Sequence, residues 1–198
     1  MAVKEQLEKP CLSAKEIQAL VKPFSKQLKN QPVFLLAIRN YFREGEREEG
    51  QDSKWIYGDG LFLYSPSCIA SFHANTDPTA KRRKKVTERG TPILKAGCYL
   101  VHRFDNFRAG REVYPAIMQR AGAVDIARDG EDAPDTLVKG MDILKGGLNM
   151  THPEGAQCIH PIEWDAFLPL VKDQFRRYHA RDWSKAIIPY ILLDSADL

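Results

Sequence analysis

The first apolar residues of the chain recur at the spacing of one helix face. Ser13 and Glu16 stand just before them as in a capping box, in which the two side chains satisfy free backbone amides at a helix start. The apolar residues at helical spacing are Ile17, Leu20, Val21, Phe24 and Leu28. Pro23 interrupts this face, so we predict an N-terminal helix that kinks or divides there.

From residue 33 onward the apolar residues form short runs between turn signals, a pattern that predicts strands. The predicted strands are Val33–Phe42, Leu61–Tyr64, Cys68–Phe72, Cys98–Phe104, Tyr114–Arg120, Val124–Arg128 and Ile187–Leu193. Those in the middle of the chain follow one another at the spacing of antiparallel meanders. The charged segments Arg43–Asp52 and Asp129–Asp135 predict surface loops.

A second, longer helix is predicted over Ile162–Tyr178. Its apolar face consists of Trp164, Phe167, Leu168, Val171, Phe175 and Tyr178. Pro169 lies inside this segment and predicts a bend or a restart of the helix. Together these elements predict a mostly β (α+β) fold with an N-terminal helix and one long C-terminal helix.

A chain of 198 residues with 43% apolar content is long enough to bury a substantial core. We predict one domain over residues 32–198, preceded by a helical extension over residues 1–31. No apolar run approaches the roughly 20 residues of a membrane-spanning helix, so no membrane insertion is expected. Met1–Pro10 lacks an apolar signal core, which predicts a protein that is cytoplasmic as made.

The formal net charge of +3 does not demand a nucleic-acid partner. The basic run Lys81–Lys85 nevertheless offers charge that would bind phosphates with release of counterions. It contains no interleaved aromatic residues on which bases would stack. A solvated surface loop is the favoured interpretation, and nucleic-acid binding through this run is the less favoured one.

The cysteines and histidines allow two interpretations of the short segment around Cys158. The four cysteines (Cys11, Cys68, Cys98 and Cys158) include no Cys-x-x-Cys pair, so no zinc site and no cofactor are expected. Cys158 lies near His152 and His160, and a histidine base would activate a cysteine nucleophile. In an extended segment Cys158 and His160 share a face about 6 to 7 Å apart, too far for a direct hydrogen bond. A buried free cysteine beside surface histidines is therefore favoured over a nucleophile.

Several short motifs occur in a distinctive order along the chain. They are Ile38–Phe42, Tyr57–Phe62, Phe72–Pro78, Leu94–Tyr99, Gly146–Thr151, Glu154–Gln157, Ile159–Trp164 and Ile188–Leu193. In order and spacing they resemble a group of phage and prophage proteins related to L,D-transpeptidases, cysteine enzymes that act on peptidoglycan stem peptides. The resemblance covers about Val33 to Leu193 and implies an L,D-transpeptidase-like β-sandwich or barrel.

The resemblance also implies where catalytic groups would stand. In that family a histidine acts as base, and a Ser-x-Gly-Cys motif carries the cysteine that forms a thioester. These histidine, serine and cysteine positions fall on Leu144, Pro153 and Ala156. None of the three replacements can do the chemistry, and three changes together indicate a natural loss of the mechanism.

The leading hypothesis is therefore a pseudoenzyme whose retained cleft binds a stem peptide, another small ligand or a protein partner. The residues expected near the ligand are Asn75, Asp77, His102, Lys145, Gly146 and Gly147. The alternative is an active cysteine peptidase or transpeptidase, a cell-wall hydrolase that uses Cys158 with His152, His160 or His102 as base. To act on the cell wall, the protein would need phage-dependent release or another export route.

Overall fold

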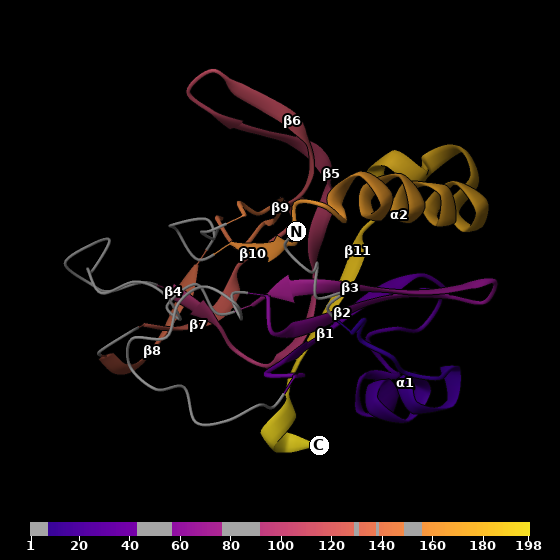
Figure 1. Ribbon diagram of the computed structural model, residues 1–198, viewed down its shortest axis with the longest axis horizontal. Coiled ribbons are helices and arrows are strands. Elements are labelled where there is room, and N and C mark those ends of the chain that lie inside the picture. Colours follow the sequence, from indigo (N-terminus) through magenta and orange to yellow (C-terminus); the bar gives the residue numbers. More distant parts are fainter. Residues whose placement is uncertain (1–7, 43–56, 77–91, 129–130, 138, 149–155) are drawn as a thin grey trace, which may run out of the picture.

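A computed structural model describes residues 8–42, 57–76, 92–128, 131–137, 139–148 and 156–198. It confirms the predicted fold class: the protein is mostly β, with a short N-terminal helix and a long C-terminal one (Figure 1). The two helices lie on opposite sides of the strands (Figure 1).

The main sheet closes into a barrel, in which the strands follow the order β1-β11-β5-β6-β9-β10-β3-β2. Their bounds are β1 Phe34–Arg39, β2 Asp59–Ser65, β3 Cys68–Asn75, β5 Gly97–Ala109, β6 Glu112–Gln119, β9 Ile143–Lys145, β10 Gln157–Ile159 and β11 Ile188–Asp194. The pairs β1–β11 and β9–β10 are parallel, and the other neighbours are antiparallel. A separate small sheet has the order β4 (Pro92–Leu94), β7 (Val124–Arg128) and β8 (Glu131–Leu137).

The N-terminal helix, α1 (Ala14–Val21), covers the outer face of β1 and β2. Both hydrogen bonds of the predicted capping box form, with Ser13 N donating to Glu16 at 2.7 Å and Glu16 N to Ser13 Oγ at 3.3 Å. The helix gives way at Lys22–Phe24 to a 3-10 turn, which confirms the predicted division at Pro23. The residues that α1 shares with the strands in one buried cluster are Ile17, Val21, Phe34, Leu36, Ile38, Phe62 and Ile191. Because β1 is covered on both faces, its apolar run is continuous and does not alternate.

The C-terminal helix, α2 (Trp164–His179), packs its predicted apolar face against the main core. Trp164, Phe167, Leu168, Val171 and Phe175 are buried, as the periodicity predicts. Pro169 is exposed, and the helix continues through it without a restart. A 3-10 segment over Ala180–Lys185 follows and leads into β11.

Parts of the strand prediction were wrong. The acidic stretch predicted as a loop forms β8 from Glu131 onward, while residues 129 and 130 lie outside the described residues. Within the described part of the chain β8 is an edge strand that pairs with β7, and charged residues are common on such a strand. β4, β9 and β10 were missed because a three-residue strand is too short to show periodicity.

A buried polar network joins the ends of β1, β2 and β3. The carboxylate of Asp59 accepts the backbone N–H of Asn40 at 2.8 Å and that of Thr76 at 2.6 Å. Arg39 donates to the carbonyls of Thr76 and Leu94 at 3.0 and 2.9 Å. Burial raises the pKa of Asp59, against the opposing effect of these hydrogen bonds. The network holds the end of β3, and thereby its pairing with β10, in place.

Candidate functional site

The segments that the resemblance assigns to a catalytic site lie on the neighbouring strands β9 and β10. These strands run parallel, with Leu144 beside Cys158. The amide of Gly146 extends the pairing by donating to the carbonyl of Ile159 at 2.9 Å. On its other side β10 pairs with β3, so Cys158 lies between Leu144 and Asn75 on adjacent strands.

Two of the implied catalytic positions carry buried apolar side chains. Leu144 is 2% exposed, and Ala156, which directly precedes β10, is 4% exposed. Both belong to the main cluster of core residues. Neither side chain can accept a proton or attack a carbonyl carbon. The third position, Pro153, lies outside the described residues.

The thiol of Cys158 is fully buried. Its Sγ donates to the carbonyl of Ala156 over 3.6 Å. A cysteine nucleophile must be reached by its substrate, and reactive cysteines lie in partly exposed, electropositive surroundings. The burial supports the free-cysteine interpretation and speaks against Cys158 as a relocated nucleophile. His152, one of the candidate bases, lies outside the described residues.

Tyr57 fills the space over the two glycines that follow β9. Its hydroxyl donates to the carbonyl of Gly147, and a Cβ on Gly146 would lie 2.0 Å from the hydroxyl oxygen. The tyrosine itself is buried, with 7% of its surface exposed. The expected cleft at these glycines is therefore occupied by one of the protein's own side chains. This occupant was not predicted from the sequence.

His160, which follows β10, packs against the same tyrosine. The two ring centroids are 4.8 Å apart, with an edge-on arrangement. Nδ1 of His160 accepts the backbone N–H of Ile162 at 3.3 Å, which places the proton of the neutral ring on Nε2. Burial lowers the pKa of His160; the carboxylate of Glu163 opposes this effect and nearby His73 adds to it. The ring is thus a neutral hydrogen-bond donor at pH 7.

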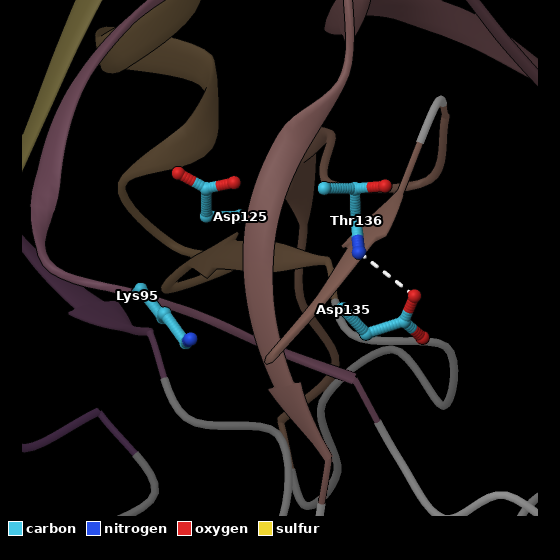
Figure 2. Close-up of a pocket in the computed structure, with 4 residues that line it drawn as sticks. All are labelled: Lys95, Asp125, Asp135 and Thr136. Atoms are coloured by element: carbon cyan, nitrogen blue, oxygen red, sulfur yellow. Dashed lines mark hydrogen bonds between the residues drawn. The ribbon is translucent and has the colours of Figure 1, made fainter. Parts of the chain in front are cut away.

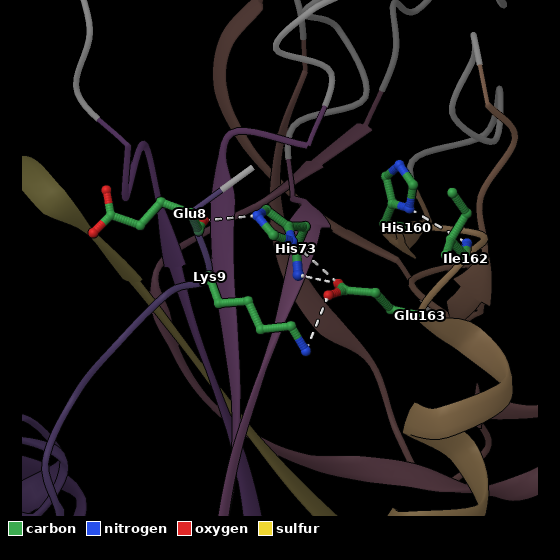
Figure 3. Close-up of polar contacts among 6 residues, drawn as sticks. All are labelled: Glu8, Lys9, His73, His160, Ile162 and Glu163. Carbon is green, nitrogen blue, oxygen red and sulfur yellow. Dashed lines mark hydrogen bonds and ion pairs between the residues drawn. The ribbon is translucent and has the colours of Figure 1, made fainter. Parts of the chain in front are cut away.

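A buried ion pair between His73 and Glu163 lies beside His160 (Figure 3). The backbone N–H of His73 donates to Glu163 Oε2 at 2.6 Å, and its Nδ1 lies 3.2 Å from the same oxygen. Nε2 lies 2.9 Å from the carbonyl of Glu8. Because a carboxylate and a carbonyl only accept hydrogen bonds, the ring makes both contacts as a donor in its protonated, cationic form, and the raised pKa of His73 favours that form.

The charges of this pair are stabilised mutually. Burial lowers the pKa of His73, but the hydrogen bond and charge of Glu163, with the carbonyl of Glu8, outweigh burial and raise it overall. Burial raises the pKa of Glu163, but the contacts with His73 outweigh burial and lower it overall. Nζ of Lys9 lies 3.6 Å from the same carboxylate. The pair therefore ties the N-terminal segment to β3 and to the start of α2.

The residues predicted to contact a ligand do not share one exposed surface. Asn75 is 3% exposed at the end of β3. Lys145, at the end of β9, is half-exposed, and its Nζ lies 4.0 Å from the carboxylate of Asp165. Asp77 lies outside the described residues. Among the members of this set that the structure describes, Lys145 is the charged side chain that a ligand beside β9 would meet.

His102, another predicted ligand contact, lies inside the barrel with no exposed surface. Its Nε2 is 2.7 Å from the carbonyl of Met141, and its ring packs edge-on against Tyr190. Nδ1 is buried and has no hydrogen-bond partner among the described residues. Burial lowers the pKa of His102 to about 4, against the effect of the Met141 carbonyl. The side chain is therefore a neutral core residue, which excludes direct contact with a ligand at the barrel surface.

A cavity of about 410 Å³ lies at the small sheet, lined by Lys95, Asp125, Asp135 and Thr136 (Figure 2). The carboxylate of Asp135 is already bound, because Arg128 Nε donates to it at 2.7 Å and the N–H of Thr136 at 2.8 Å. Asp125 and Thr136 are exposed. The contact between Arg128 and Asp135 links β7 to β8, and we assign no ligand to the cavity.

Other predicted features concern partners. Within the described ranges, no group of three or more histidine, cysteine, aspartate or glutamate side chains is arranged to hold a metal ion. No helix in those same parts of the chain is long and apolar enough to cross a membrane. The basic run Lys81–Lys85 lies outside the described residues, so both its predicted loop and its role with nucleic acid stay predictions.

Comparisons of the chain with models of protein families, with curated proteins and with solved structures each find no match. The functional argument therefore depends on the residues and the geometry of the chain itself.

Proposed function

We propose that this chain is a catalytically degenerate, phage-type L,D-transpeptidase-like module that binds a peptidoglycan stem peptide beside β9 and β10. The observation that carries the proposal is the burial of Leu144 and Ala156 in the apolar core. The resemblance assigns the base and the nucleophile to these two positions. A protein that loses its catalytic pair but keeps its fold is expected to have apolar side chains at these two positions. Replacement of a buried polar pair by apolar groups costs little stability.

The surroundings of β9 support a role in binding. Lys145 offers a half-exposed cation to the carboxylates of a stem peptide, and its ion pair with the exposed Asp165 is long and therefore weak. Gly146 and Gly147 carry no side chains, so a peptide backbone would approach the carbonyl of Gly147 closely once Tyr57 moves aside.

We expect a soluble stem tetrapeptide to bind the protein without being cleaved or transferred. Isothermal titration measures the binding, and mass spectrometry of the peptide after long incubation detects any loss of its terminal residue. Lys145→Ala should weaken binding roughly ten-fold, as removal of a charged hydrogen-bond donor does. Lys185→Ala, an exposed lysine on the segment after α2, is the matched control and should bind like the wild type.

Two results would reject this function. If neither the wild type nor a variant without the Tyr57 side chain binds the peptide at millimolar concentration, a stem peptide is excluded as the ligand. Turnover of the peptide, together with a covalent adduct on Cys158, would instead establish the active cysteine enzyme.

A further inference from the structure

The side chain of Tyr57 fits the space beside Gly146 as a ligand fits a pocket. A Cβ at position 146 would lie 2.0 Å from the tyrosine hydroxyl oxygen and 3.0 Å from Cζ. Such distances exclude any side chain at this position while Tyr57 is in place. Gly146, which directly follows β9, therefore leaves a recess beside it, and the phenol ring fills this recess.

The recess offers one polar contact and several apolar ones. At its end the carbonyl of Gly147 accepts the hydroxyl proton of Tyr57. Burial, with the neighbouring Cys158, raises the pKa of Tyr57, so its hydroxyl stays protonated and donates. The ring packs against the thiol of Cys158 and lies edge-on to His160. The walls thus accept a flat group, and the far end accepts one hydrogen bond.

Tyr57 is also separate from the main core. Among the described residues, its buried cluster consists of Tyr57 and Cys158 alone, whereas the barrel interior and α2 form a different and much larger cluster. Removal of the ring from the recess would therefore expose Cys158 and the two glycines without disturbing the packing of the barrel interior.

We propose that this recess is a binding site for a flat group with a hydrogen-bond donor, and that Tyr57 is its resident occupant, which a ligand has to displace. A peptide amide has this form, because it is planar and its N–H would replace the tyrosine hydroxyl at the carbonyl of Gly147. The identification of that amide with a stem peptide rests on the proposed function, whereas the recess itself does not.

Thiol labelling of the Tyr57→Ala variant tests the site. Each cysteine is followed by mass spectrometry: Cys11 is exposed, Cys68 and Cys98 are half-buried, and Cys158 is buried. In Tyr57→Ala we expect Cys158 to be modified on the order of ten-fold faster or more, with the rates of the other three unchanged. Tyr64→Ala, which removes a tyrosine that stacks on Phe34 elsewhere in the barrel, is the matched control and should leave Cys158 slow.

Phenol then serves as a probe of the vacated recess. We expect phenol to slow the labelling of Cys158 in Tyr57→Ala, and benzene, which has the ring but no donor, to slow it less. Neither compound should change the labelling of exposed Cys11. Equal protection by the two compounds, or protection by neither, would overturn the assignment of a site that selects a hydrogen-bond donor.

Slow labelling of Cys158 in folded Tyr57→Ala would overturn the proposal outright. If all four cysteines react equally fast, that variant is unfolded, and Tyr57→Phe decides instead. It keeps the ring and loses the donor, so Cys158 should react roughly five-fold faster than in the wild type, and an unchanged rate would reject the site. Fast labelling of Cys158 in Tyr57→Ala, without any binding of stem peptide, retains the recess and rejects the proposed function. Slow labelling of Cys158 in a protein that binds the stem peptide rejects the recess and retains the proposed function.

Discussion

Replacement of Glu163 with alanine is expected to lower the free energy of unfolding by about 3 kcal/mol near pH 6, because it leaves the buried cation of His73 unpaired. The carboxylate is 13% exposed and the imidazole 7% exposed, so little solvent is available to replace the lost partner. The variant also removes the acceptor of the backbone N–H of His73. Urea unfolding followed by circular dichroism measures the loss.

Asp165→Ala is the matched control for this variant. Asp165 is two residues further along, in the first turn of α2, but its side chain is 87% exposed and its ion pair with Lys145 spans 4.0 Å. An exposed pair of this kind contributes about 0.5 kcal/mol or less. Equal losses of stability in the two variants would show that the charge at the helix start matters and that the pair with His73 does not.

The pH dependence of the same difference follows from the two pKa shifts. The folded pKa of His73 is raised, so its stabilising contribution is complete below its ordinary value of 6.5 and is lost as pH rises through the folded value. The folded pKa of Glu163 is lowered, so its contribution is complete above its ordinary value of 4.5 and is lost as pH falls through the folded value. The stability gap between wild type and Glu163→Ala should therefore be widest between pH 4.5 and 6.5. A gap that does not vary from pH 4 to pH 9 would contradict an ionic pair.

The parts of the fold that were predictable from the sequence are those set by local periodicity. The face of α2 that contains Trp164 and Phe175 recurs every three or four residues, so a single stretch of sequence reveals it. Val124–Arg128 alternates and was predicted with its observed bounds. β9 and β10 were not predictable in this way, because each has three residues and exists through pairing with strands distant in the chain.

In the candidate site, too, some residues were identified from the sequence and others only from the structure. Leu144 and Ala156 were identified through the resemblance, and the structure adds that both are buried in one core. Tyr57 and Gly147, which determine whether the recess is open, are 90 residues apart in the chain. His73 and Glu163 are also 90 residues apart, and no motif spacing signals such a contact. The sequence signal that was available was chemical: an isolated histidine in an apolar strand requires a partner when it is buried.

His102 is expected to make its own contribution to the acid sensitivity of the wild type. Its folded pKa is about 4, below the ordinary value of 6.5, because the ring is fully buried in the barrel. Between pH 6.5 and 4 the unfolded chain binds a proton at this residue and the folded chain does not, so stability falls as the pH falls. At 1.36 kcal/mol per pH unit, the loss over this interval is about 3 kcal/mol.

His102→Gln removes this titration while its amide N–H can still donate to the carbonyl of Met141. The variant should be less stable than the wild type at pH 7.5, because its shape fits the barrel less well. Its stability should nevertheless fall less on acidification, so the two curves converge or cross towards pH 4. The remaining histidines and the carboxylates titrate in both proteins and cancel in the comparison. Urea midpoints measured at half-unit steps of pH give the curves, and parallel curves would mean that His102 already takes up its proton in the folded barrel near pH 6.5.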